Sequence, residues 1–137
     1  MKCPPPETEA LIEKAWGSEP FNTYGVSEGG GGVECERHEG IHLFEDLYIF
    51  EVVDAENRPV PDGTPGHKLL ITNLVNRVQP FIRYEVTDLV TMETRACRCG
   101  RPFRLARSID GRSDDLIYLE TDRDARCQSI QSSSAVR

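Results

Sequence analysis

Residues 80–89 combine strand-forming side chains with groups that can do chemistry. The segment begins apolar and then places Arg83, Glu85 and Asp88 within six residues. Its aromatic and β-branched residues are typical of a β-strand. We expect Asp88 near the end of that strand, where side chains commonly leave the sheet and contact ligands. Taken alone, the segment also fits an ordinary strand with a solvated charged face.

Two further polar motifs flank this segment, one on each side. In chain order the three motifs are Tyr24-Gly25-Val26-Ser27-Glu28, Arg83-Tyr84-Glu85-Val86-Thr87-Asp88-Leu89 and Gly111-Arg112-Ser113-Asp114-Asp115. Together they resemble the motifs of the adenylate-forming enzyme superfamily, and three in order are more specific than one. Between them stand Glu34-Cys35, Gly40-Ile41-His42, Glu45-Asp46 and Cys97-Arg98-Cys99-Gly100-Arg101, which are similar to the phenylacetate–coenzyme A ligase branch. The resemblance covers roughly residues 8 to 119.

The resemblance implies ATP-dependent activation of a carboxylic acid through an acyl-adenylate, with coenzyme A as the thiol that then displaces AMP. Its implied nucleotide site consists of Tyr24 along the adenine, Gly25, Ser27 near the α-phosphate, Asp88 at the ribose hydroxyls and Arg112 at ribose or phosphate. Glu28 would hold Mg²⁺, which suits a hard carboxylate oxygen. Asp114 matches the hinge about which a C-terminal domain turns between the two half-reactions. The alternative is a plain Asp88–Arg112 ion pair, with Asp114 in a turn.

Cysteine spacing, taken together with the resemblance, predicts a structural zinc site. Cys97 and Cys99 flank one residue and precede Gly100, so both sulfurs can face one point from a tight turn. The resemblance brings Cys35 and a histidine, His42 rather than His38, beside that turn. Three thiolates and one imidazole make a closed tetrahedral set of the structural type. A Cys-x-Cys pair is less diagnostic than Cys-x-x-Cys, so reduced thiols remain the alternative.

The chain also departs from the family pattern. No Ser/Thr/Gly-rich phosphate loop stands in residues 1–23, and no lysine follows Lys68 to act as the catalytic lysine of the small C-terminal domain. We therefore predict a fragment or truncated relative of such a ligase that is inactive alone. Such a piece should expose apolar surface, which favours self-association. The alternative function is a standalone zinc-stabilised binding or interaction module without catalytic activity.

The elements that must position these motifs are mostly strands. We predict an α+β, mainly β fold: a small antiparallel, barrel-like sheet with a short N-terminal helix. The helix is expected to run from an N-cap at Thr8 to Ala15 and to pack through Leu11 and Ala15. Strands are expected at residues 21–25, 47–54, 68–74, 80–90 or 80–92, 103–107 and 116–119, and the glycine run at 29–32 is expected to be a loop. Residues 1–7 form a loose lead-in, 8–119 the barrel-like subdomain and 120–137 a polar disordered tail.

Composition limits the class of protein. The 137 residues suffice for one domain with a core but not for two substantial ones. A formal net charge of −7 disfavours nucleic acid or an anionic membrane as a partner. No apolar run reaches membrane-spanning length, and the N-terminus lacks the apolar segment of a secretory signal. The five cysteines favour reduced thiols or metal ligands over a disulfide framework, so we expect a cytoplasmic protein.

Overall fold

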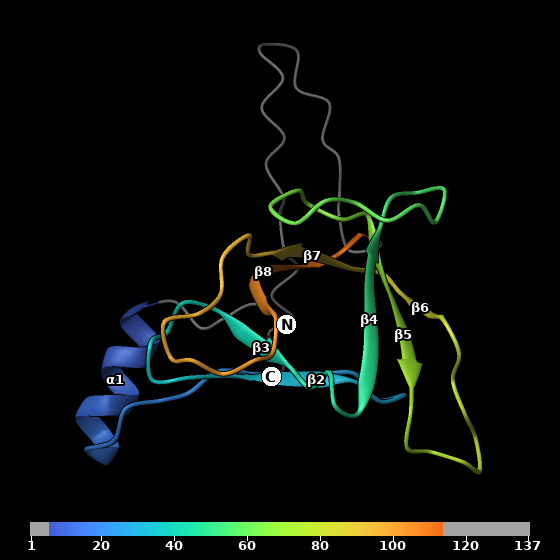
Figure 1. Ribbon diagram of the computed structural model, residues 1–137. Helices are drawn as coiled ribbons and strands as arrows, with labels where there is room; N and C mark the ends of the chain where they lie inside the picture. Colours follow the sequence, from blue (N-terminus) through green and yellow to red (C-terminus); the bar gives the residue numbers. More distant parts are fainter. Residues whose placement is uncertain (1–5, 114–137) are drawn as a thin grey trace, which may run out of the picture.

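The structure, a computed structural model that describes residues 6–113, consists of two antiparallel β-sheets around a shared core, with one helix beside them (Figure 1). The larger sheet has the strand order β1-β2-β3-β8-β7 and the smaller β4-β5-β6. The elements are α1 Pro6–Trp16, β1 Thr23–Gly25, β2 Gly31–Glu34, β3 Ile41–Leu43, β4 Tyr48–Val53, β5 Lys68–Asn73, β6 Tyr84–Val86, β7 Asp88–Met92 and β8 Leu105–Arg112. The prediction of a mainly β, antiparallel fold with a short N-terminal helix is confirmed. Over the described residues the sheets remain open rather than closing into one barrel.

The core lies between the two sheets and draws on both. Leu43 and Val90 of the larger sheet belong to one cluster with Phe50, Leu69 and Ile71 of the smaller, and each is at most 2% exposed. Burying a side chain of this size contributes roughly 1.5–3 kcal/mol relative to leaving it in water. The two sheets therefore form one packed unit.

The chain crosses from the smaller sheet to the larger at Thr87. β6 pairs with β5 through Tyr84 and Ile71, whereas β7 pairs with β8. The prediction of one strand over residues 80–92 is therefore wrong. Arg83 is one reason, because its φ of 49° lies in the left-handed region and interrupts the extended backbone before β6. As a result Asp88 begins a strand at the junction of the sheets instead of ending one.

The glycine run is only partly the predicted loop. Gly29 and Gly30 have φ of 111° and 112° and form the turn, but Gly31 and Gly32 begin β2. A Cβ on Gly32 would lie 2.3 Å from the backbone oxygen of His42, so only glycine allows β3 to approach this closely. Sequence reasoning predicted neither β2 nor β3, because glycines and very short runs carry little strand signal.

The remaining strands lie near their predicted positions. β1, β4 and β5 fall within the strands expected at 21–25, 47–54 and 68–74. The strand expected at 103–107 is only the beginning of β8, which continues through Gly111 to Arg112. The third polar motif therefore starts inside a strand, and this extension brings Arg112 beside β7.

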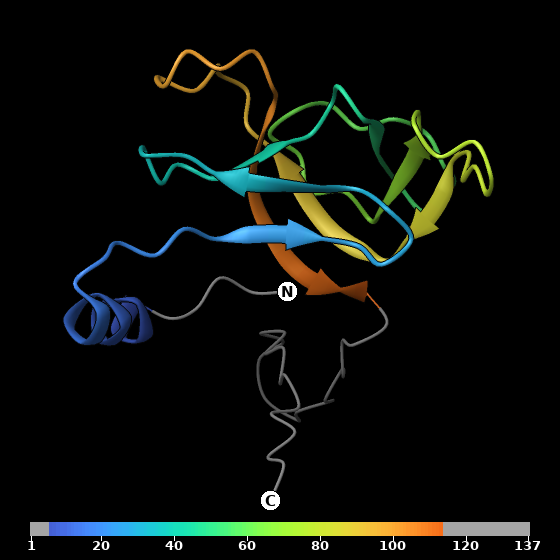
Figure 2. The ribbon, with the colours of Figure 1, turned by 90° about the horizontal axis from the view of Figure 1, so that it is seen from below.

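The helix forms as predicted in type but not in packing. α1 begins at Pro6, so Thr8 lies in its first turn and is not the N-cap. Leu11 is 66% exposed and Ala15 is also exposed, so the prediction that they pack against the sheet is wrong. Figure 2 shows α1 at the margin of the molecule, beyond the sheets. Within residues 6–113, no helix has the length and apolar character that a membrane crossing requires.

Some predicted features lie outside the described residues. They are the hinge residue Asp114, the strand at 116–119, the tail at 120–137 and most of the lead-in at 1–7. The domain boundaries remain predictions.

Candidate functional site

Residues from the three predicted motifs meet at the junction of the sheets, and we call them the Asp88 centre: Tyr24, Asp88 and Arg112. The Tyr24 hydroxyl donates a hydrogen bond to Asp88 Oδ2 at 2.6 Å. Arg112 Nε lies 3.6 Å from Asp88 Oδ1. The register of β7 and β8 pairs Asp88 directly with Arg112, so the sheet itself sets this ion pair. The hydrogen bond from Tyr24 joins groups that are 64 positions apart in the chain.

Burial sets the electrostatics of the Asp88 centre. Asp88 is 4% exposed and Tyr24 6%, whereas the Arg112 side chain is 59% exposed. Burial, reinforced by the hydrogen bond to Asp88, raises the pKa of Tyr24 far above its usual value, so the phenol stays protonated and remains a donor. A carboxylate offers about four lone-pair positions, so Asp88 can accept hydrogen bonds in addition to the one from Tyr24.

A second tyrosine–carboxylate pair involves Glu28. The Tyr84 hydroxyl donates to Glu28 Oε1 at 3.0 Å. This hydrogen bond raises the pKa of Tyr84, while the charge of Arg112 acts in the opposite direction. Arg112 therefore acts electrostatically on both Tyr24 and Tyr84. Sequence reasoning included Tyr84 in the central motif but assigned it no role, because nothing in a strand-forming tyrosine indicates which carboxylate its hydroxyl will meet.

The remaining predicted nucleotide residues are Gly25, which ends β1, and Ser27, in the turn that follows it. Both are exposed, and a Cβ added to Gly25 would meet no atom within 4 Å. This side of the turn is therefore open. Among the described residues, no contact links Ser27 to the Asp88 centre. Ser27 is next to Glu28 in the chain, but the structure does not bring it into contact with Tyr24, Asp88 or Arg112.

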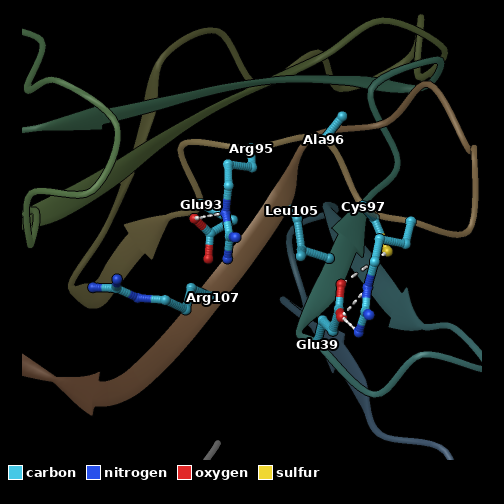
Figure 3. Close-up of a pocket in the computed structure, with 8 residues that line it drawn as sticks. Glu39, Glu93, Arg95, Ala96, Cys97, Leu105 and Arg107 are labelled. Carbon is cyan, nitrogen blue, oxygen red and sulfur yellow. Dashed lines mark hydrogen bonds and ion pairs between the residues drawn. The ribbon is translucent and has the colours of Figure 1, made fainter.

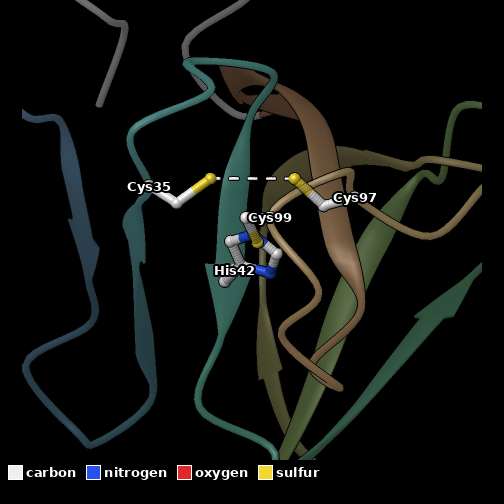
Figure 4. Close-up of side chains that lie close together, drawn as sticks. All are labelled: Cys35, His42, Cys97 and Cys99. Carbon is white, nitrogen blue, oxygen red and sulfur yellow. Dashed lines mark hydrogen bonds between the residues drawn. The ribbon is translucent and has the colours of Figure 1, made fainter.

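The four predicted zinc ligands also come together, and we call them the Cys–His cluster: Cys35, His42, Cys97 and Cys99 (Figure 4). Cys35 follows β2, His42 lies in β3, and the other two occupy the turn between β7 and β8. Their ligand atoms all lie within 4.8 Å of one another. Gly100, with a φ of 80°, donates its backbone N–H to the Cys97 oxygen at 3.2 Å, which closes the predicted tight turn.

Distances within the Cys–His cluster fit a tetrahedral metal. Zinc bonds of about 2.3 Å to sulfur and about 2.0 Å to nitrogen place tetrahedral sulfurs about 3.8 Å apart and a sulfur–nitrogen pair about 3.5 Å apart. Cys35 Sγ and Cys97 Sγ are 3.7 Å apart, and Cys99 Sγ lies 3.3 Å from His42 Nε2. His42 Nδ1 lies 3.1 Å from the Phe103 backbone oxygen. That contact suits an Nδ1–H donor, which leaves Nε2 free to bind metal.

The thiols of the cluster differ in acidity. Burial raises the pKa of Cys97 to about 11. Burial also acts to raise the pKa of Cys99, but hydrogen bonds with Arg101, Cys97 and Cys35 together outweigh it and lower this pKa to about 6. Cys99 is thus readily available as a thiolate, the form that binds metal. The alternative ligand His38 lies elsewhere, with its ring nitrogens 3.1 Å from Glu19 and 3.3 Å from Glu34.

No family model matches the chain, but solved structures share its fold. One is 2-hydroxyisobutyryl-CoA ligase in a postadenylation state with 2-HIB-AMP: TM-score 0.72, 29% identity, covering 93% of this chain and 26% of that one. Another is the same ligase with 2-HIB-AMP and CoA: TM-score 0.68, 31% identity, covering 81% of this chain and 24% of that one. The fold is therefore that of a part of an adenylate-forming ligase.

Curated relatives place the chain more narrowly. Phenylacetate-coenzyme A ligase of Thermus thermophilus is 38% identical over 122 residues, which are 83% of this chain and 27% of the relative. The enzyme of the same name from Escherichia coli is 35% identical over 122 residues, again 83% and 27%. The chain belongs to the phenylacetate–coenzyme A ligase-like branch of the adenylate-forming enzymes, and it spans about a quarter of the length of the relatives it matches. These comparisons do not support a standalone zinc module, because most of the chain aligns with ligases.

Proposed function

We propose that this chain contributes one wall of the nucleotide pocket of an ATP-dependent ligase that activates a carboxylic acid as an acyl-adenylate. The observation that carries the proposal is the Asp88 centre, in which side chains of all three motifs converge. A plain Asp88–Arg112 ion pair would not require Tyr24 to donate to the same buried carboxylate. The likeness to ligases named for phenylacetate supports an aryl acid as the substrate class, and coenzyme A as the acceptor.

In this pocket Asp88 accepts hydrogen bonds from the ribose hydroxyls, and Arg112 contacts ribose or phosphate through its exposed guanidinium. Tyr24 has its hydroxyl committed to Asp88, so it orients that carboxylate as well as lying along the adenine. The open side of Gly25 leaves room for the base, and Ser27 approaches the α-phosphate. Holding the nucleotide in place and neutralising its charge are the main demands of this chemistry.

Glu28 fits the proposed magnesium ligand. Its Oε1 accepts the Tyr84 hydrogen bond, which fixes the orientation of the carboxylate. Mg²⁺ is usually bound through one or two carboxylates together with phosphates and water, so one oriented carboxylate is an adequate protein contribution. The ion, when bound, would neutralise phosphate charge.

We propose that the Cys–His cluster holds one structural Zn²⁺. A closed set of three sulfurs and one imidazole leaves no open position for substrate, which distinguishes a structural site from a catalytic one. The metal would fasten the turn between β7 and β8 to β2 and β3. Cysteines that bind a metal must be kept reduced, so we propose that the enzyme acts in the cytoplasm.

The test of the ligase proposal begins with the chain alone. We expect no ATP–pyrophosphate exchange with aryl acids, because the chain spans about a quarter of the relatives' length. Sustained exchange would contradict the proposal that residues beyond this segment are required.

AMP should still bind weakly to the chain alone, since a single wall of the pocket leaves the phosphates in water. An Asp88→Asn chain should bind AMP less well than the unaltered chain. Arg58→Gln is the control and should bind AMP normally, because the Arg58 guanidinium pairs with Asp54 and, among the described residues, does not contact the Asp88 centre.

A further inference from the structure

A cavity apart from the Asp88 centre lies against the outside of the Cys–His cluster. It has a volume of about 610 Å³ and is bordered by β8, the turn between β7 and β8, and the loop between β2 and β3 (Figure 3). This volume is in the range of small-molecule sites. Of the cluster only Cys97 lines it, and none of Tyr24, Asp88 and Arg112 does. Nothing in the proposed ligase function therefore accounts for this cavity.

Three arginines line this cavity. Arg107 belongs to β8, and Arg95 and Arg98 come from the turn between β7 and β8. Arg98 is held by Glu39, to which its Nε donates at 2.8 Å. Arg95 Nε lies 3.9 Å from Glu93, a loose contact. These carboxylates orient guanidiniums without using all five N–H donors of each.

Arg107 differs from the other two arginines. Among the described residues, no carboxylate lies within ion-pair distance of its guanidinium, whereas Arg95 and Arg98 each have one. The hydrogen bond from Arg98 lowers the pKa of Glu39, and a backbone hydrogen bond lowers the pKa of Glu93, so both acids are ionised at neutral pH. Three guanidiniums against two carboxylates leave one formal positive charge in a chain whose net charge is −7.

The cavity also offers an apolar surface. Ala96, which is exposed, supplies this surface, and Leu105, which is only 3% exposed, lies beneath it. In Figure 3 Arg95, Arg107 and Glu93 lie on the same side of Leu105, so two guanidiniums face one carboxylate there, and Glu39 lies on the other side. Guanidiniums recognise phosphate oxygens in bidentate fashion, and an apolar floor accommodates the group that the phosphate carries. We propose that this cavity binds a phosphomonoester, with the phosphate at Arg107 and Arg95 and its organic group against Ala96.

The test titrates the ¹⁵N-labelled full chain with phenyl phosphate and follows backbone amide shifts. We expect saturable shifts at residues 93–107 and affinity on the order of tenfold weaker in an Arg107→Gln chain, because a charge-assisted contact is lost. Arg95→Gln should weaken binding in the same direction. Arg77→Gln, the same charge change at an exposed arginine outside the cavity, should leave affinity unchanged. Equal weakening in Arg77→Gln would show a non-specific charge effect and overturn the proposal.

Two further arms make the result specific. Benzoate carries the same ring with a single negative charge, and binding as tight as that of phenyl phosphate would contradict recognition of a phosphate. An Asp88→Asn chain should keep full affinity for phenyl phosphate, so failure at this cavity and failure of the proposed nucleotide pocket give different results. AMP and coenzyme A, titrated separately, distinguish the two sources of a phosphomonoester that the ligase relatives suggest. No saturable shift at residues 93–107 with any of these probes would overturn the proposal.

Discussion

The Asp88 centre and the Cys–His cluster are both assembled from distant segments, yet they differ in how complete they are. The Cys–His cluster has four ligand atoms within 4.8 Å and needs no group from outside the described residues. The Asp88 centre has one buried carboxylate, but its cation Arg112 faces solvent and the turn at Gly25 is open. A closed set suits a structural role, whereas an open one suits a pocket that other parts of a ligase complete.

The largest effect should come from breaking the closed site. We expect the purified chain to carry about one zinc, and a Cys97→Ser chain to lose it together with much of the stability, which for a domain is only about 5–15 kcal/mol. Metal analysis and thermal unfolding measure both. Cys3→Ser, the same substitution at a cysteine that is not one of the four predicted ligands, is the matched control and should keep zinc and melting temperature. A Cys97→Ser chain with full zinc and unchanged melting would contradict a structural site.

A smaller effect should come from the Asp88 centre. Tyr24→Phe removes the hydroxyl and leaves Asp88 Oδ2 buried without its donor, which costs about 1–3 kcal/mol in the free energy of unfolding. Zinc content should not change, because Tyr24 has no contact with the cluster in the described residues. Urea denaturation and metal analysis on the same samples separate the two sites. Loss of zinc in Tyr24→Phe would show that the sites are coupled and would remove the contrast between them.

How far the sequence predicted these two regions depends on what kind of information each requires. Motif order identified Asp88 and Arg112, because their types and spacing resemble a family pattern. The same reasoning missed the change of sheet at Thr87, since residues 80–92 carry continuous strand composition and only the left-handed Arg83 interrupts it. Tyr84 was missed because the partner of a hydroxyl is fixed by register, which local sequence does not specify.

The Cys–His cluster and the helix show the same limit. The pair Cys97 and Cys99 could be read from spacing, but His42 Nδ1 facing the Phe103 oxygen depends on how β3 meets β8. Helical spacing correctly predicted α1. It could not predict that Leu11 faces solvent. A periodic apolar face indicates a surface that packs against another element, but it does not identify that element.

The smallest effect on stability is expected at this exposed face. Leu11 and Trp16, 66% and 81% exposed, together offer apolar surface for self-association. A Leu11→Gln/Trp16→Gln chain should change the free energy of unfolding by no more than about 0.5 kcal/mol, as exposed positions usually do. Its apparent mass by light scattering should depend less on concentration than that of the unaltered chain. A stable monomer for the unaltered chain across a wide concentration range would contradict self-association.

The most direct test of the central claim places the Asp88 centre among the remaining parts of a related ligase. In a chimera, this chain replaces the segment of the Thermus thermophilus phenylacetate-coenzyme A ligase that it matches. We expect acid-dependent ATP–pyrophosphate exchange from the chimera and a loss of roughly tenfold or more in Asp88→Asn, because a charged acceptor for the ribose is removed. Arg58→Gln should exchange at the rate of the parent chimera. A folded chimera without exchange, or one whose exchange is unaffected by Asp88→Asn, would contradict the account.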